Sequence, residues 1–313
     1  MSSDAFLNCR FLENITVDEE NTNYKSDITS VYSGTNNSTL FRVFVSYSGE
    51  YSIPSYITNI SSSCFNYCVN ITSIQINNDD LIYIGHDTFS YCSSLKSILI
   101  KRSITNISYQ VFDHCTSLTN IIIPETVTEI GHDTFSYCTS LKSILIKGSF
   151  TILDYSVFDH CTSLTNITIP ETVTKIGTSA FSYCTSLTNI TIPETVTKIG
   201  ALAFDHCTSL TNITIPESVE TIGALAFGYC TSLTNITIPE TVTKIGALAF
   251  DHCTSLTNIT IPESVETIGA LAFGYCTSLT NITIQMMHFK MEAIYMLQMK
   301  QFYQNSAKSF LEK

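Results

Sequence analysis

The chain has 313 residues, and one internal repeat fills most of that length, so the sequence predicts an extended array and not two average domains. A formal net charge of −12 without a cluster of Lys or Arg excludes nucleic acid and an anionic membrane surface as expected partners. The sequence shows no apolar run of about 18 residues that would span a bilayer and no secretory signal pattern over Met1–Asn14. Taken alone, these features predict a soluble protein without an export route.

The N-terminal segment, residues 1–17, is predicted to be a partial repeat. Its apolar residues occupy the positions of the later units: Ala5, Phe6, Cys9, Leu12, Ile15 and Val17. No polar cap precedes them, and a bare terminal coil would expose apolar surface and an unpaired strand edge. We therefore expect either further upstream sequence or a partner over this end, and end-to-end self-association stays open.

Residues 18–50 interrupt the period and are rich in Asn, Ser and Tyr. The β-branched and aromatic content of Leu40–Val45 predicts a strand, and Ile28–Tyr32 is expected to pair with it across the turn residues Ser33–Asn37. We interpret this segment as a hairpin-like insertion and not as a separate domain, because the repeat resumes directly at residue 51.

Residues 51–284 repeat a 23-residue unit, of which Ala201–Gly223 (ALAFDHCTSLTNITIPESVETIG) is a representative copy. Within it, Leu210–Ile215 alternates apolar and polar residues, which predicts a short strand. Pro216 lacks a donor for the ladder and ends that strand, and Val219–Ile222 is predicted to be a second extended piece. One unit buries too few side chains to fold alone, so neighbouring units must stack.

Cysteines recur at the same position of each unit. They are Cys92, Cys115, Cys138, Cys161, Cys184, Cys207, Cys230, Cys253 and Cys276. This regularity indicates a column of small, buried, reduced side chains in a shared core. Stacked neighbours would lie about 4.8 Å apart, which is also within reach of a disulfide, so the redox state stays open.

The residue before each cysteine alternates between His and Tyr, which gives a higher period of 46 residues. The dipeptides Asp113-His114, Asp159-His160, Asp205-His206 and Asp251-His252 suggest a general base or a metal site. Copies two coils apart are roughly 10 Å from one another, too far for several His to share one ion, so we interpret them as turn residues. We predict no metal, no cofactor and no catalytic residues; an enzyme would need a site in residues 18–50 or in the C-terminal tail.

The tail, residues 285–313, has no Gly or Pro and places apolar residues at helical spacing. These are Phe289, Ala293, Met296, Met299, Tyr303, Ala307 and Phe310. The pattern predicts an amphipathic helix. We expect it to cap the last coil, while a membrane-surface helix, a partner-binding helix and a tail created by a change of reading frame stay open.

The outward strand positions are the candidate site for a partner. They form two polar rows, Asn166, Asn189, Asn212, Asn235 and Asn258 beside Thr168, Thr191, Thr214, Thr237 and Thr260. Solubility of a one-sided sheet would explain the same residues, and a match to an ice lattice is a further alternative. The Asn-Ile-Thr triplets are also acceptor sequences for N-glycans, which would cover this face in an exported protein.

The unit resembles the BspA-type leucine-rich repeat, since Leu187–Cys207 matches its pattern of Leu, Ile, Pro, Val, Gly, Ala, Phe and Cys positions. The resemblance covers roughly residues 5–17 and 51–284, with Lys101 and Lys147 in place of Pro. It implies a right-handed leucine-rich-repeat solenoid or horseshoe with short parallel strands and about 11 to 12 coils of 23 residues, which the C-terminal helix predicted from residue spacing would follow.

That resemblance also implies a function. The family includes surface antigens implicated in adhesion, so we expect a non-enzymatic protein at the cell surface that binds a protein or glycan through its strand face. The alternative is a cytoplasmic interaction scaffold, which agrees better with reduced cysteines and with the sequence as it begins.

Overall fold

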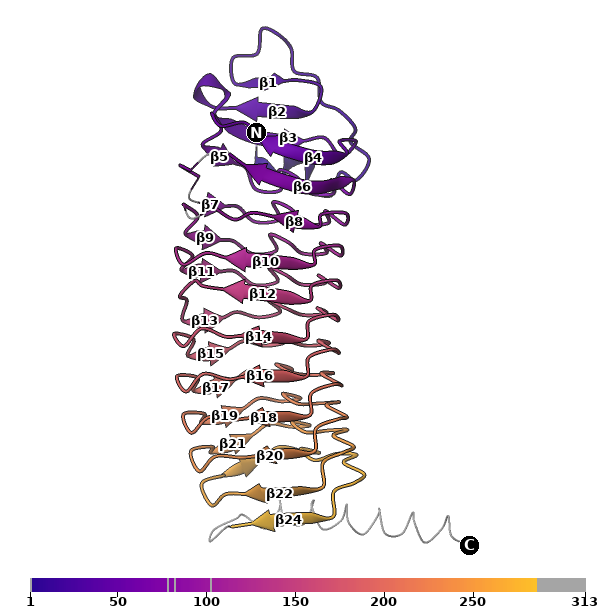
Figure 1. The fold of residues 1–313 in the computed structure, drawn as a ribbon, viewed down its shortest axis with the longest axis vertical. Helices are drawn as coiled ribbons and strands as arrows, with labels where there is room; N and C mark the ends of the chain where they lie inside the picture. The colour runs from indigo at the N-terminus through magenta and orange to yellow at the C-terminus, as the bar shows by residue number, and fades with distance from the viewer. Residues whose placement is uncertain (1, 78, 82, 102, 286–313) are drawn as a thin grey trace, which may run out of the picture.

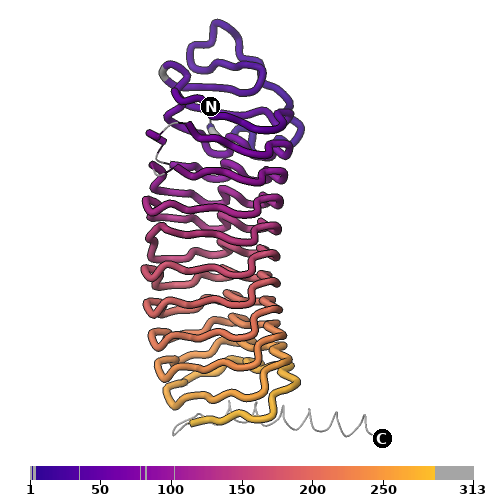
Figure 2. Tube along the Cα trace, viewed as in Figure 1, coloured from indigo at the N-terminus to yellow at the C-terminus, as the bar shows by residue number. Residues whose placement is uncertain are grey.

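The computed structural model describes residues 2–77, 79–81, 83–101 and 103–285, which form one elongated stack of coils (Figure 1). The chain rises through about 11 turns of roughly 23 residues, and each coil lies directly on the preceding one (Figure 2). The predicted repeat solenoid is therefore confirmed. The C-terminal helix expected over residues 285–313 lies, apart from Gln285, outside the described residues.

Each coil contributes one strand to a first column, formed by the segment that the sequence predicts as the strand before Pro. The strands of this column are β4 (Gly49–Ile53), β6 (Ile71–Ile76), β8 (Ser97–Ile98), β10 (Asn120–Ile123), β12 (Ser143–Ile146), β14 (Asn166–Thr168), β16 (Asn189–Thr191), β18 (Asn212–Thr214), β20 (Asn235–Thr237), β22 (Asn258–Ile261) and β24 (Asn281–Ile284). All pairings within this column are parallel and join equivalent residues of successive units, as in Asn166 with Asn189.

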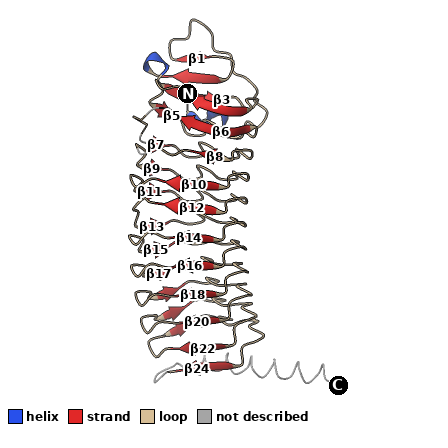
Figure 3. Ribbon diagram, in the orientation of Figure 1, coloured by secondary structure: helices blue, strands red, loops and turns tan. Residues whose placement is uncertain are grey.

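The shorter second strands form a second parallel column beside the first (Figure 3). They are β5 (Asn59–Ile60), β7 (Tyr83–Ile84), β9 (Asn106–Ile107), β11 (Glu129–Ile130), β13 (Ile152–Leu153), β15 (Lys175–Ile176), β17 (Lys198–Ile199), β19 (Thr221–Ile222), β21 (Lys244–Ile245) and β23 (Thr267–Ile268). Tight turns separate the two columns. In one of them, the Val196 N–H donates to the carbonyl oxygen of Pro193, 3.0 Å away.

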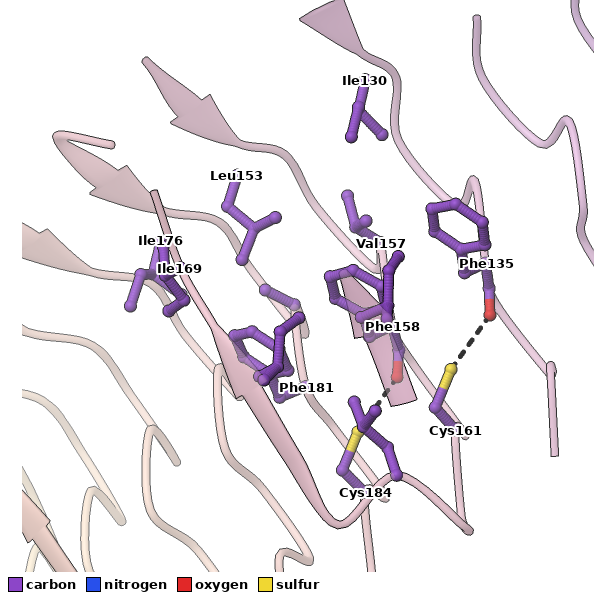
Figure 4. Packing of buried hydrophobic residues seen from close by; sticks show 14 of the residues in the cluster. Ile130, Phe135, Leu153, Val157, Phe158, Cys161, Ile169, Ile176, Phe181 and Cys184 are labelled. Atoms are coloured by element: carbon purple, nitrogen blue, oxygen red, sulfur yellow. Dashed lines mark hydrogen bonds between the residues drawn. The ribbon is translucent and has the colours of Figure 1, made fainter. Parts of the chain in front are cut away.

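The core is a set of columns, because each inward position of one unit packs against the same position of the next. Phe158, Phe181 and their equivalents form a column from Phe65 to Phe273 with ring centroids 5.2–5.5 Å apart, and all pairs after the tilted Phe65–Phe89 pair are stacked. Figure 4 shows Phe135, Phe158 and Phe181 between two other columns of the core, with Ile130, Leu153 and Ile176 on one side and Cys161 and Cys184 on the other. Burial is shared between coils, which is why one unit alone cannot fold.

The glycine that closes each unit keeps the coils close together. A Cβ atom added to Gly200 would lie 2.6 Å from the carbonyl carbon of Gly177 in the preceding coil. A larger side chain at Gly200 would therefore require the backbone to move. Ser108 and Asp154 occupy the same position in two earlier units.

The N-terminal segments form a cap on the first coil. They comprise the 3₁₀ helices η1 (Ser3–Phe6) and η2 (Thr35–Asn37) and the strands β1 (Tyr24–Ser26), β2 (Ser30–Ser33) and β3 (Thr39–Val43). The antiparallel pairing expected between the two segments of the hairpin is present in β2 and β3. β3 also pairs in parallel with β5, so coil stacking begins before residue 51.

This cap has its own small hydrophobic cluster. Val31, Phe41 and Phe44 are buried, and Phe6, Ile15, Val17 and Tyr24 pack against them. The predicted partial repeat and the predicted insertion thus lie together at the N-terminal end of the stack (Figure 1). The domain boundaries proposed from the sequence, at residues 17, 50 and 284, remain predictions.

Candidate interaction face

The two polar rows predicted as a partner site lie on the outer side of the first strand column. In β14, Asn166 and Thr168 are exposed and Ile167 between them is buried, and β16, β18 and β20 repeat that pattern. Because the parallel register joins Asn to Asn and Thr to Thr, each row is continuous from coil to coil. The structure therefore places all ten predicted residues on one face.

The two rows differ in how their polar groups are bonded. The amide of Asn212 donates to the hydroxyl of Thr211, 3.4 Å away, and the amides of Asn189, Asn235 and Asn258 bond to the preceding Thr in the same way. By contrast, Thr168, Thr191, Thr214, Thr237 and Thr260 form no side-chain hydrogen bond within the described part of the chain. The Thr row therefore offers hydroxyl groups that a ligand can bond without breaking a protein contact.

The same face changes character toward the N-terminal cap. Leu99, Ile122 and Leu145 occupy the position of the Thr row, and all three are exposed. Leu99 directly follows β8, whereas Ile122 and Leu145 lie in β10 and β12. The sequence interpretation missed them, because it followed the consensus of the later units. Aligning the units would have found them, since Leu, Ile and Leu stand where the later copies have Thr.

The Asp-His dipeptides lie in the turn after the buried Phe, where they form an aromatic ladder. The rings stack from Tyr67 to Tyr275 with centroids 4.2–4.4 Å apart, and Tyr alternates with His from Tyr91 onward. The guanidinium of Arg10 lies 4.7 Å from the centroid of the Tyr67 ring, at the N-terminal end of the ladder. The alternation of Tyr and His seen in the sequence thus corresponds to one column in which each ring stacks on the ring of the next coil.

In the ladder, His160, His206 and His252 are each hydrogen-bonded to the Asp before them. Nδ1 of His206 lies 2.8 Å from Oδ2 of Asp205, whose side chain is only 6% exposed. The other oxygen, Oδ1, is buried and has no hydrogen-bond partner among the described residues. It fills the space beside Gly228, where an added Cβ would lie 2.7 Å from it. Burial raises the pKa of the Asp205 carboxyl above its ordinary value, and the hydrogen bond from His206 opposes that shift.

These dipeptides do not form a metal site in the structure as described. Over the described residues, no group of three or more His, Cys, Asp or Glu side chains is placed to hold an ion. The backbone at His206 has a φ of +57°, and the alternating Tyr residues adopt the same left-handed conformation. The position shared by His206 and the equivalent Tyr residues is therefore characterised by a left-handed turn and by stacking of its ring on those of the neighbouring coils.

The cysteines form a buried column, as predicted. All twelve are free, and all except Cys9 are buried. Each thiol from Cys92 to Cys276 donates to the carbonyl oxygen of a Phe in the preceding coil at 3.1–3.2 Å.

Among the described residues, no helix is both long and apolar enough to cross a membrane.

Stacked coils with parallel strands, a Leu, Ile and Phe core and outward polar rows define a leucine-rich repeat solenoid. The family model for a BspA type leucine rich repeat region matches six copies, over residues 1–124, 58–188, 106–227 and 174–308. The chain belongs to this family.

Solved structures of leucine-rich proteins have the same fold. The chain is similar to a leucine rich cell surface protein from Faecalibacterium prausnitzii A2-165, with 25% identity, a TM-score of 0.56 and coverage of 87% of this chain and 97% of that one. A leucine-rich repeat protein from Eubacterium ventriosum has 25% identity and a TM-score of 0.52, over 69% of this chain and 52% of its own. The pneumococcal vaccine antigen PcpA, at 16% identity, a TM-score of 0.50 and coverage of 85% and 88%, shares the fold. No curated protein sequence matches the chain significantly.

Proposed function

We propose that the protein is a non-enzymatic adhesion protein that binds a protein or glycan through the outer face of its first strand column. The observation that supports this proposal is the continuous row of Thr hydroxyls from Thr168 to Thr260, which form no side-chain hydrogen bond within the described part of the chain. A rigid, repetitive scaffold holds this row in register, so a ligand meets an ordered set of donors and acceptors. The asparagine row beside it, from Asn166 to Asn258, belongs to the same proposed contact surface.

The proposed location is the cell surface. Its support is the likeness over 87% of the chain to a protein described as a leucine rich cell surface protein. The alternative is an intracellular interaction scaffold, which the twelve free cysteines favour, because thiols persist in reducing compartments. Labelling intact cells with a reagent that cannot cross membranes separates the two: labelled protein supports adhesion, and unlabelled protein supports the scaffold.

The binding face is tested with a triple variant, Thr191→Lys, Thr214→Lys and Thr237→Lys, against a printed glycan array and a panel of purified extracellular-matrix proteins. We expect the variant to lose at least about tenfold in affinity, because three long cations cover the hydroxyl row. The matched control is Thr174→Lys, Thr197→Lys and Thr243→Lys, which adds the same charge at exposed positions next to the second strand column. Equal loss in both variants, or no loss in the first, would reject the strand face.

Glycan occupancy is a separate test of the same face. Mass spectrometry of the native protein should find Asn189, Asn212 and Asn235 unmodified, because a glycan on each would cover the Thr row. High occupancy at these positions would exclude the bare face as the contact surface.

A further inference from the structure

An apolar stripe interrupts the polar face near the N-terminal cap. Leu99, Ile122 and Leu145 are 64%, 50% and 50% exposed, respectively. Ile122 and Leu145 are direct partners in the parallel register of β10 and β12, and Leu99 holds the same position one coil earlier. Single exposed apolar residues are common on protein surfaces, but a contiguous group marks an interaction site.

The stripe is not part of the core and is not needed for the fold. The same position is polar in the coils on either side, with Gln75 before the stripe and Thr168 after it, both exposed. The inward neighbours Ile98 and Ile144 are buried, as are the equivalent Ile167 and Ile190 of the later coils. A fold that uses Thr at this position in its later units has no structural need for three apolar residues here.

Two lysines lie beside the stripe. Lys96 and Lys142 are exposed and directly precede β8 and β12, so each lies three residues, about 10 Å of extended chain, before Leu99 or Leu145. Neither lysine forms an ion pair with a described residue, and the segments 93–101, 116–124 and 139–147 contain no Asp or Glu. In a chain of net charge −12, this face is locally basic.

We propose that this apolar-basic patch (Lys96, Leu99, Ile122, Lys142 and Leu145) binds an acidic amphipathic helix of a partner protein. The inference rests on the proposed function, since it gives the strand face a defined partner. The three apolar residues form the centre of the contact and the lysines pair with carboxylates on the flank of the helix, about one helix diameter away.

The structure favours a helix over an added strand. β10 is hydrogen-bonded to β12, and backbone bonds from Thr119 to Lys96 and from Lys142 to Thr119 join the three coils. The patch therefore has no open strand edge for a partner to extend, so contact is through side chains. An apolar helix face on a sheet face is the usual way to bury such a stripe.

Charge decides among the other occupants. An anionic membrane would face the whole acidic molecule, whereas a single helix contacts only the basic patch, so the net charge of −12 opposes membrane docking more than it opposes an acidic helix. The chain's own tail, residues 285–313, contains four Lys and two Glu, so it has the wrong sign for Lys96 and Lys142. An acidic helix from another protein satisfies both the apolar and the basic parts of the patch.

The test uses three synthetic helical peptides of equal length: leucine on one face and glutamate on the other, the same peptide with lysine for glutamate, and the first with serine for leucine. Fluorescence anisotropy should show binding of the leucine–glutamate peptide only. The patch variant Leu99→Thr, Ile122→Thr and Leu145→Thr should bind it at least about tenfold more weakly. Thr is the residue of the later coils at this position, and an unchanged circular dichroism spectrum and unfolding midpoint confirm folding.

Two further variants make the result specific. Lys96→Thr with Lys142→Thr should weaken binding and reduce its dependence on salt, because the screened charge pairs are gone. The variant Thr174→Lys, Thr197→Lys and Thr243→Lys, whose substitutions lie next to the second strand column and outside both proposed contact surfaces, should bind the peptide about as tightly as the wild type. The proposed function fails if glycan or matrix binding survives replacement of Thr191, Thr214 and Thr237, and this outcome is distinct from a failure of the peptide to bind the patch.

The proposal is overturned if the wild type does not bind the leucine–glutamate peptide, or if it binds the lysine peptide equally well. It is also overturned if the patch variant retains full binding. Sedimentation with phosphatidylserine-phosphatidylcholine vesicles that the patch variant abolishes would assign the patch to a membrane instead. A dimer seen by analytical ultracentrifugation in the wild type, and lost in the patch variant, would assign it to a second copy of the chain.

Discussion

The thiol of Cys184 donates a hydrogen bond to the carbonyl oxygen of Phe158, 26 residues earlier in the chain, with the two atoms 3.2 Å apart (Figure 4). The same bond recurs in the coils from Cys92 to Cys276, so the sulfur column links each unit to its neighbour. Cysteine suits the position because it is small enough for the core and still provides a weak donor for that carbonyl.

The buried thiols from Cys92 to Cys276 should therefore be unreactive in the folded protein. Burial raises the pKa of the Cys184 thiol well above its ordinary value of 9.0, so little of the reactive thiolate forms at neutral pH. Burial also keeps reagents away from the sulfur atom. We expect an aromatic disulfide reagent to modify only Cys9, which is partly exposed, at neutral pH without denaturant. In denaturant, all twelve thiols should react. Rapid native modification of several thiols would contradict the buried column.

The pairing of Asp205 with His206 alternates with Ser182-Tyr183 in the preceding coil, and both types of pair continue the same aromatic ladder. The backbone φ is +57° at His206 and +54° at Tyr183, so either ring fits the turn. What distinguishes the pairs is the buried carboxylate, which needs the imidazole Nδ1 as a donor.

A double-mutant cycle tests this dependence. His206→Tyr alone keeps the ring stack but leaves the buried Asp205 without its donor, which should lower the free energy of unfolding by about 1–3 kcal/mol. Adding Asp205→Ser recreates the Ser-Tyr pair of the preceding coil and should recover most of that loss. Urea denaturation of the two single variants and the double variant measures the coupling.

Additive effects of the two substitutions would show that the ladder does not depend on the Asp-His pair. Tyr229→Phe serves as the control, because it retains a stacking ring next to His206 and leaves the Asp205-His206 hydrogen bond in place. Its effect on the free energy of unfolding should be small.

Much of the fold could be predicted from the sequence because the same order of apolar and polar residues recurs in each unit. The apolar alternation in Leu210–Ile215 and the stop at Pro216 define the first strand, and the cysteine period predicts a stacked core column. The antiparallel pairing of Ile28–Tyr32 with Leu40–Val45 also followed from local composition.

Other features depend on contacts between coils, which no single unit contains. The ring ladder follows from the left-handed turn at His206, which aims each imidazole or phenol at its neighbour in the next coil. The cap depends on Phe6 and Ile15 meeting Phe41 from a different segment. On the candidate face, exposure of Asn212 and Thr214 was predictable from strand alternation, whereas Leu99 and Ile122 were missed because apolar residues were assigned to the core.

Asp205 also gives the protein a specific dependence on pH. Burial raises the pKa of its carboxyl above the ordinary value of 3.8, while the His206 hydrogen bond and charge oppose the shift and Asp159 adds to it. A carboxyl with a raised pKa in the folded state binds its proton more readily than in the unfolded chain. Its favourable contribution is therefore complete below pH 3.8 and is lost as the pH rises through the folded-state pKa.

The neutral variant Asp205→Asn removes this contribution while keeping an oxygen that can accept from His206. Compared with the wild type, the variant should gain stability as the pH rises from below 3.8 through the folded-state pKa, and the difference should then level off. Urea denaturation of both proteins at a series of pH values from 3 to 7 measures that difference. The opposite slope, with the wild type gaining on the variant as the pH rises, would mean that attraction to His206 outweighs burial at this carboxyl.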